Sequence, residues 1–281
     1  MNDRRNSFLR RFLRHRMAVA GILILLVIIG MAASASIFYP QGPWKLVGRP
    51  LLWPGDNAKF PLGTDFLGRD LLAALLYGAQ VSLFIGLAAT LVATLLGTFV
   101  GATAGYFGGA VDRAMMGFTE VFQTIPPFVL AVVVVAAFQP TLTTIVVAIS
   151  LVSWPPLARL VRAQFLQLMP AEFIQAAILM GMSDARIILT QLLPNAVTPI
   201  VVSGSLMIAS AILLEAGLSF LGLGDPNAMS WGYIIASGRE VLRTDWYITA
   251  LPGLAVLAAV LAINLVGEGL NDALNPRSRN R

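Results

Sequence analysis

The sequence contains no cysteine and a single histidine, and only 12% of its 281 residues are charged. The absence of cysteine excludes disulfides and thiolate chemistry within the chain, and one histidine is too few for a histidine-based metal site. Soluble domains carry roughly 25% charged residues, whereas 57% of this chain is hydrophobic and its mean hydropathy is +0.80. That much apolar surface cannot be hidden in a soluble globule, and a disordered chain needs the opposite composition. The class that remains is an integral membrane protein.

Long uncharged runs indicate how often the chain crosses the membrane. A spanning helix needs about 20 mostly apolar residues, and these runs are continuous rather than alternating as in a β-barrel. The sequence therefore predicts an all-α polytopic membrane protein with six transmembrane helices, at 17–38, 80–105, 112–138, 142–162, 195–222 and 247–268. The expected segments are a basic cytoplasmic N-terminal segment (1–16), the first transmembrane helix (17–38), an extracytoplasmic loop (39–79), a core domain of five helices (80–268) with a long cytoplasmic loop at 163–194, and a cytoplasmic C-terminal tail (269–281).

The first span also has features of a signal peptide. Basic residues precede it, and Ala33-Ser34-Ala35 is similar to a cleavage site. Its apolar run is longer than the roughly 7–15 residues of a signal-peptide core, so we expect an uncleaved anchor.

Arginine placement predicts the orientation. Six arginines precede the first span and three follow the last. In the two longer external segments, 39–79 and 223–246, acidic residues balance the basic ones. The positive-inside rule then predicts that both ends of the chain face the cytoplasm. The net charge of +5 reflects this topology, and since no aromatic–basic recognition motif is present we expect no nucleic-acid partner.

Catalytic motifs are scarce. The sequence has no phosphate-binding P-loop, no H-E-x-x-H zinc motif and no nucleophile elbow, so we expect that the chain is not itself an enzyme. An ion gradient or another subunit must then supply the energy for any transport.

The loop at 163–194 is the most informative segment. Pro170 suits a first helical turn, Glu172 lies near the positive end of the helix, and Gly181 is expected to end it. Ser183 or Asp184 can cap a second helix that leads into the fifth span. A short amphipathic helix of this kind can lie on lipid, but its apolar face and few basic residues favour docking into a groove of another protein.

Four segments carry a resemblance to a known family. Gln175-Ala176-Ala177, Gly181 and Leu193-Pro194 keep the spacing of the EAA loop of ABC-importer permeases, with Gln175 in place of glutamate and Gln191 in place of isoleucine. The stretches 62–70, 215–224 with 230–232, and 252–254 with 264–276 resemble further signatures of the peptide/nickel branch, from which Ala73, Ala74 and Gln80 depart. Over about 62–277 the chain resembles the "C" permease of the dipeptide/oligopeptide/nickel importer family.

The resemblance implies a five-part machine in the bacterial cytoplasmic (inner) membrane, in contact with membrane lipid. This chain would pair with a homologous B-type permease, two ABC ATPase subunits would dock beneath, and an extracytoplasmic binding protein would deliver the substrate. This chain would carry no cofactor, and ATP and Mg would bind the ATPases. The EAA helix would be the coupling helix, through Glu172, Phe173, Gln175, Ala176, Ala177, Gly181 and Met182. The alternative for the two alanines is that they are simply good helix formers.

Other polar or helix-breaking residues in the apolar runs are candidates for the pathway. Glu120 lies about two turns into the third span, near Gln123, Pro126-Pro127 is expected to kink this span, and Glu215 lies near the outer end of the fifth. Glu120 could instead pair with Arg113 or Arg159, and Glu215 could stabilise a turn. The glycines at 97, 101 and 105 predict close approach to a helix of this chain or of the partner permease. Aromatic residues in 225–247 form either an interfacial belt or a docking surface for the binding protein.

The cargo is expected to be a small peptide, with nickel or another small solute as the alternative. One histidine and no cysteine leave no nitrogen–sulfur cage for a metal. An ATP-independent secondary carrier is the rival function, but such carriers often have internal repeats, and no clear repeat relates the two halves of this chain.

Overall fold

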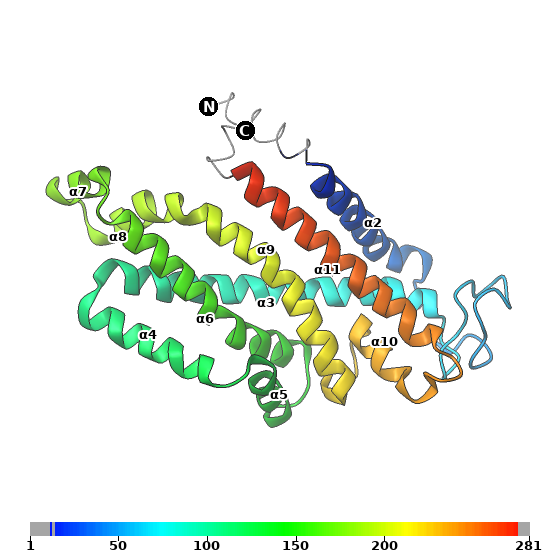
Figure 1. Cartoon of the computed structure of the whole chain (residues 1–281). Coiled ribbons are helices and arrows are strands. Elements are labelled where there is room, and N and C mark those ends of the chain that lie inside the picture. The colour runs from blue at the N-terminus through cyan, green and yellow to red at the C-terminus, as the bar shows by residue number, and fades with distance from the viewer. Residues whose placement is uncertain (1–11, 13–14, 275–281) are drawn as a thin grey trace.

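A computed structural model describes residue 12 and residues 15–274, and within this part the chain is helical without β-strands. Figure 1 shows a bundle of long helices with short helices at its two ends. The elements are α2 (Arg16–Phe38), α3 (Leu71–Phe107), α4 (Gly109–Thr124), α5 (Pro127–Ala137), α6 (Leu142–Leu168), α7 (Glu172–Leu179), α8 (Asp184–Ile187), the π-helix η1 (Ile188–Leu192), α9 (Leu193–Leu218), the π-helix η2 (Ser219–Leu223), α10 (Trp231–Ser237), the 3₁₀ turn η3 (Arg239–Val241) and α11 (Tyr247–Leu274).

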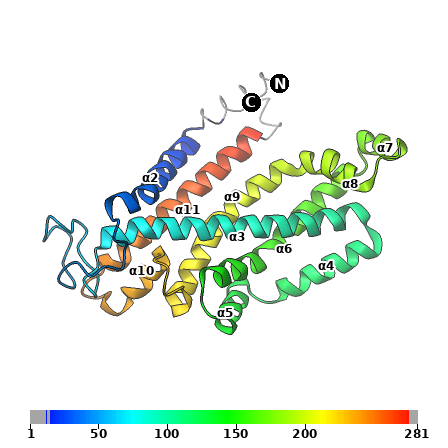
Figure 2. The ribbon, with the colours of Figure 1, turned by 180° about the vertical axis from the view of Figure 1, so that it is seen from behind.

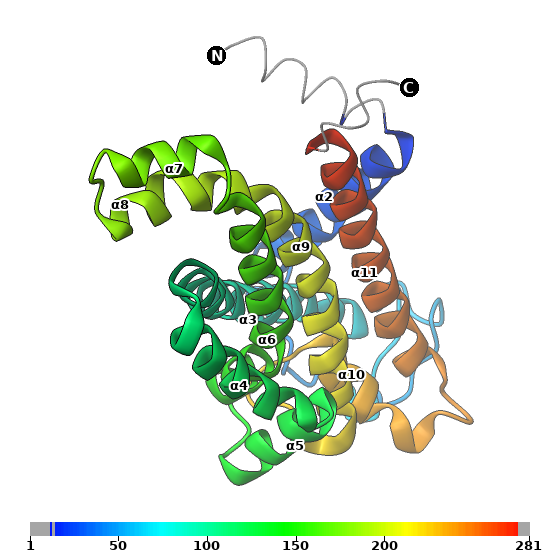
Figure 3. The same ribbon diagram turned by 60° about the vertical axis from the view of Figure 1, so that its left-hand side comes forward.

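The long helices match the predicted spans in number and order. Five helical stretches of the described chain are long and apolar enough to cross a membrane, and the pair α4–α5 makes a sixth span if it is counted as one. Figure 3 places α7, the start of α2 and the end of α11 toward one end of the bundle, with α5 and α10 toward the other. With an even number of crossings, the start of α2 and the end of α11 must lie on the same side of the membrane.

The third span is broken rather than straight. α4 and α5 meet at an angle of 83°, and the residues between them, Ile125 and Pro126, have extended backbone. A proline disfavours helical backbone in the residue before it, and Pro127 lacks the N–H that would continue the helix. The kink predicted at Pro126-Pro127 is therefore confirmed as a sharp bend.

α3 begins at Leu71, nine residues before the predicted start of the second span. The side chain of Asp70 caps it by accepting a hydrogen bond from the backbone N–H of Leu72 at 2.8 Å. With 37 residues, α3 is about 55 Å long, well beyond the roughly 30 Å of the hydrocarbon core. Its first turns occupy residues 71–79, which the sequence alone places in the external loop.

The glycines at 97, 101 and 105 pack α3 against α6. Added Cβ atoms would lie 2.8 Å from the carbonyl oxygen of Trp154 at Gly97 and 2.7 Å from the Cβ of Phe165 at Gly105, and would overlap the carbonyl oxygen of Ala158 at Gly101. Figure 2 shows α3 running the length of the molecule beside α6 and α4 on one flank and α2 and α11 on the other. The close partner of these glycines is thus a helix of this chain.

The aromatic residues of 225–247 do not form an exposed belt. Trp231 and Tyr247 are almost fully buried, whereas Trp246 is exposed. The indole N–H of Trp231 donates to the carbonyl oxygen of Leu75 at 3.0 Å. The expectation of an interfacial belt is wrong for Trp231 and Tyr247, because α10 folds back against α3 and α11.

Candidate functional site

The loop between α6 and α9 forms a short helix that projects from one end of the bundle. α7 starts at Glu172 in its first turn, and Ala171 occupies the N-cap position. Pro170 lies just outside the helix rather than inside its first turn. Figure 3 shows α7 and α8 standing away from the long helices at the end of α6.

Gly181 ends this helix as the sequence predicts. Its φ is +73°, a conformation that costs glycine little and residues with a Cβ more. Its N–H donates to the carbonyl of Ile178 at 2.9 Å, and the N–H of Met182 donates to that of Ala177 at 3.2 Å. These two bonds form a Schellman motif, which fixes the direction in which the chain leaves α7.

One face of α7 is buried in this chain. Ile174 and Ala177 are 0% and 3% exposed. They belong to a cluster that includes Leu157, Val161 and Phe165 of α6 and Ile187, Leu192, Ala196 and Ile200 of the following segments. Ala177, predicted to contact the ATPase, therefore faces the membrane helices instead and fixes α7 to them.

The opposite face of α7 is apolar and uncovered. Leu179, Met180 and Phe173 are 87%, 73% and 44% exposed. Ala176 is exposed between them, as are Glu172, Gln175 and Gly181, and Met182 is partly buried. The sequence prediction missed Leu179 and Met180, although they follow Phe173 and Ala176 at helical spacing. We name Phe173, Ala176, Leu179 and Met180 the outer face of α7.

Side-chain bonds connect this loop to the long helices. The hydroxyl of Tyr106, at the end of α3, donates to Oδ1 of Asp184 at 2.7 Å. Gln175 Nε2 donates to the carbonyl of Met169 at 2.9 Å. Asp184, predicted as a possible helix cap, binds Tyr106 instead, and Ser183 occupies the cap position without a side-chain hydrogen bond. These bonds tie the loop to the ends of both α3 and α6.

Close by, an ion pair joins α4 to α6. Arg162 donates through Nη2 to Oδ2 of Asp112 at 2.6 Å, and its Nε contacts Oδ1 of the same carboxylate. Two parallel bonds of this kind define the geometry of both partners. The pair holds the start of the broken third span against the helix that leads to α7.

We expect Arg162→Gln and Asp112→Asn each to destabilise the chain, and the double variant to cost less than their sum. The coupling energy should be on the order of 1 kcal/mol, since the two residues touch directly. Thermal unfolding of the purified variants in detergent measures it. Strictly additive effects would contradict a stabilising pair.

The predicted pathway residues of the third span lie near its bend. Glu120 and Gln123 are in α4, and Pro126 lies between α4 and α5. Glu120 and Pro126 are exposed and Gln123 is partly buried. Among the described residues, Glu120 forms no ion pair with Arg113 or Arg159, and the nearby pairing is that of Arg162 with Asp112. A place for Glu120 on the pathway stays a prediction.

Glu215 has a different environment. It is 1% exposed, and its Oε1 accepts hydrogen bonds from the hydroxyls of Ser219 at 2.7 Å and Ser230 at 2.6 Å. Ser230 also caps α10. Of the two readings left open by the sequence, the geometry favours stabilisation of the turn between α9 and α10 over a place on the pathway.

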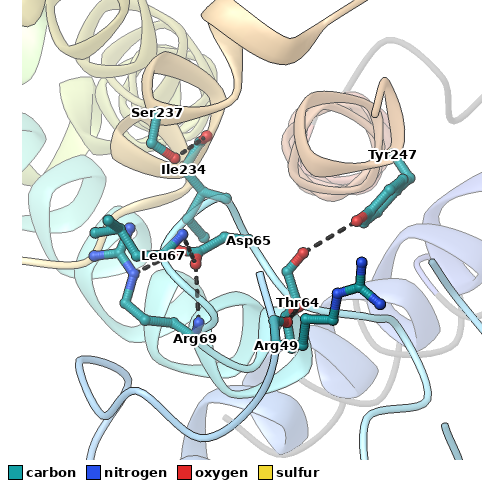
Figure 4. Close-up of polar contacts among 8 residues, drawn as sticks. All are labelled: Arg49, Thr64, Asp65, Leu67, Arg69, Ile234, Ser237 and Tyr247. Atoms are coloured by element: carbon teal, nitrogen blue, oxygen red, sulfur yellow. Dashed lines mark hydrogen bonds and ion pairs between the residues drawn. The ribbon is translucent and has the colours of Figure 1, made fainter. Parts of the chain in front are cut away.

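The external segment before α3 is held by a buried polar cluster, shown in Figure 4. Asp65 accepts hydrogen bonds from the N–H groups of Leu67 and Arg69, both at 2.9 Å, and pairs with the Arg69 guanidinium. The hydroxyl of Tyr247 donates to the carbonyls of Leu52 at 2.8 Å and Thr64 at 3.0 Å. The 62–70 signature thus binds the loop to the start of α11, which is a structural role.

Comparison with known proteins places the chain in a family. Residues 97–280 match the family described as "Binding-protein-dependent transport system inner membrane component". Residues 5–58 match "N-terminal TM domain of oligopeptide transport permease C". The two matches cover most of the chain and leave residues 59–96 between them.

Several relatives align over nearly their full length. The "Di/tripeptide transport system permease protein DppC" of Pseudomonas aeruginosa is 38% identical over 98% of this chain and 92% of its own. The "Oligopeptide transport system permease protein OppC" of Escherichia coli K12 is 38% identical over 96% and 90%. The "Glutathione transport system permease protein GsiD" of Pectobacterium atrosepticum is 37% identical over 96% and 90%.

A solved structure of the inward-facing MetNI methionine ABC transporter has a similar fold. Its TM-score is 0.59 at 18% identity, over 72% of this chain and 96% of that one. Fold and sequence therefore agree: this chain belongs to the binding-protein-dependent inner-membrane permeases of the ABC importers, in the branch with an oligopeptide-permease-C N-terminal domain. It is an inner-membrane protein.

Proposed function

We propose that this chain is the C-type permease subunit of an ATP-driven importer of small peptides. It forms the translocation pathway with a homologous B-type permease. Two ATPase subunits, which bind ATP and Mg, dock on its cytoplasmic side and on that of its partner. An extracytoplasmic binding protein delivers the peptide.

The observation that carries this proposal is the outer face of α7. Leu179 and Met180 lie at the end of a helix whose other face is packed into this chain. An apolar helix face with few basic neighbours fits a groove in another protein better than an anionic lipid surface. In the arrangement proposed, the groove belongs to the ATPase.

The connections of α7 describe how the ATPase would act on the pathway. Closure of the ATPase dimer moves α7, and Ile174 and Ala177 transfer the motion to Phe165 and Val161 of α6. The Tyr106–Asp184 bond transfers it to α3. Rigid-body rocking of these helices then changes access from the outside to the inside.

The relatives favour a peptide as the cargo. Those compared above are named for di/tripeptides, oligopeptides and glutathione, which are all peptides. No group of three or more His, Cys, Asp or Glu residues suited to a metal occurs within the described part of the chain. Both points favour peptides over nickel.

Purification of the tagged chain from native membranes in mild detergent tests the proposal. Wild type is expected to bring down a second permease and two P-loop ATPases, and Gly181→Asp, which disrupts the turn that ends α7, is expected to lose the ATPases. The binding protein of the same system can then be assayed for peptide binding. A chain that purifies alone and transports solute in liposomes without ATP would establish the secondary carrier instead.

A further inference from the structure

The chain has only two lysines, Lys45 and Lys59, against 17 arginines. Both lysines line one cavity of about 280 Å³ at the external end of α2. They lie 14 positions apart in a loop and come together through the fold. The Lys45 ammonium donates to Oε1 of Gln41, which lines the same cavity. An ammonium group offers three hydrogen-bond donors, so both lysines can also donate to an anion held there.

The wall of this cavity is preformed. Pro40, Gly42 and Pro43 make a tight turn in which the N–H of Gly42 donates to the carbonyl of Tyr39 at 3.0 Å. That same carbonyl accepts a bond from the hydroxyl of Tyr77 on α3 at 2.9 Å. Gly42 has a φ of +76°, and the two prolines fix their own φ. A rigid wall lowers the entropic cost of binding a ligand.

The one acidic residue of the cavity is already occupied. Oδ1 of Asp70 caps α3 through the N–H of Leu72. Burial and, second, the Asp70 carboxylate raise the pKa of Tyr39 to about 12, so the phenol stays protonated and adds no negative charge to the cavity. With two lysines against one aspartate among its lining residues, the cavity has an excess of positive charge.

An apolar surface continues from the cavity down the first span. Phe38, which lines the cavity, and Ile37 beside it are 72% and 76% exposed. Farther along α2, Val27, Leu26 and Leu23 are 62%, 58% and 58% exposed. The surface is therefore cationic at the external end of α2 and apolar along the helix. This arrangement is complementary to a phospholipid, whose phosphate lies above its acyl chains.

We propose that this cavity binds the phosphodiester of an outer-leaflet phospholipid, with Lys45 and Lys59 on the phosphate and an acyl chain on the exposed side of α2. Lysine binds phosphate as a point charge. The position at a helix end places the two ammonium groups at headgroup level. The proposal is independent of which solute the transporter carries. Its consequence is that a specific lipid fixes the first span, which packs mainly on α3 and α11 in the described part of the chain, to the external loop.

Because both lysines of the protein line the cavity, amine chemistry reports on it directly. We would label the purified full-length chain in maltoside detergent with a water-soluble N-hydroxysuccinimide ester and quantify Lys45 and Lys59 by peptide mass spectrometry. Dihexanoyl-phosphatidylglycerol at ten times its dissociation constant is expected to slow labelling about tenfold. Dihexanoylglycerol, which has the same chains but no phosphate, is expected to leave the rate unchanged.

Each other outcome of this titration opposes the proposal. Unchanged labelling with the phospholipid would overturn it, and so would equal protection by inorganic phosphate, which would make the site one for free anions. Protection by the extracytoplasmic binding protein, without protection by the phospholipid, would assign the cavity to a protein partner.

Native mass spectrometry of variants gives an independent readout. Lys45→Gln/Lys59→Gln is expected to lose most of the co-purified phospholipid that wild type retains. Arg49→Gln/Arg243→Gln is the matched control, since it removes the same charge from exposed external arginines that do not line the cavity. Equal retention by the two double variants would contradict the site.

Discussion

Leu179→Asp is expected to abolish ATP-driven import while the chain still folds and inserts. Leu179 is the most exposed large apolar residue of α7, so the substitution disturbs no packing within this chain. Docking would bury the new carboxylate without a partner, which is costly. Loss of a central interface residue costs about 2 kcal/mol or more, a factor of about 30 in affinity. Uptake by the reconstituted complex and ATPase co-purification both measure the effect.

A conservative substitution at the same position serves as the control. Leu179→Met keeps the apolar contact and is expected to retain import. Wild-type, ATP-dependent uptake by the Leu179→Asp complex would show that the outer face of α7 is not the docking surface.

Gly101→Leu is expected to cause the largest loss of stability. A Cβ at this position would overlap the carbonyl oxygen of Ala158 and meet the Cβ of Val161 at 2.8 Å. The overlap is with a backbone atom, which cannot move away by a change of rotamer. α3 and α6 must therefore separate. Overpacking costs about 1–3 kcal/mol even for extra methylenes, and a whole leucine side chain here should exceed that. Thermal unfolding and the monodisperse fraction in detergent measure the loss.

Gly30→Leu is the matched control. Gly30 also lies in a membrane-spanning helix, but nothing lies within 4 Å of a Cβ added there. Leucine is a better helix former than glycine by about 1 kcal/mol, so this variant should be as stable as wild type or more so. Equal stability of the two leucine variants would refute the close α3–α6 contact.

Local signals were sufficient to predict the long helices, the bend in the third span and the end of α7, but not α10. Continuous apolar runs gave the spans, Pro126-Pro127 gave the bend, and Gly181 gave the end of α7. Each depends on residues within a few positions of one another. The start of α3 was missed because a span of ordinary length was expected inside the uncharged run 71–111, whereas the helix occupies nearly all of that run.

The residues that the sequence could not place depend on contacts between distant segments. Ala177 looks like a surface residue of an amphipathic helix, yet the fold packs it with Phe165 and Ile187. The pairing of Arg162 with Asp112, 50 positions apart, is set by how α4 lies on α6. Trp231 is buried by residues of α3 about 150 positions earlier. No local pattern contains this information.

A single cysteine at position 179 tests the docking of α7 most directly. The natural chain has no cysteine, so Leu179→Cys introduces one unique thiol on the outer face, and Trp246→Cys places a control thiol on the exposed external surface. In native membranes with a short thiol–amine cross-linker, Leu179→Cys is predicted to form an adduct with the ATPase subunit, and Trp246→Cys is predicted to form none. If Leu179→Cys forms no adduct with the ATPase in membranes where the complex imports peptide, α7 does not dock on the ATPase through its outer face.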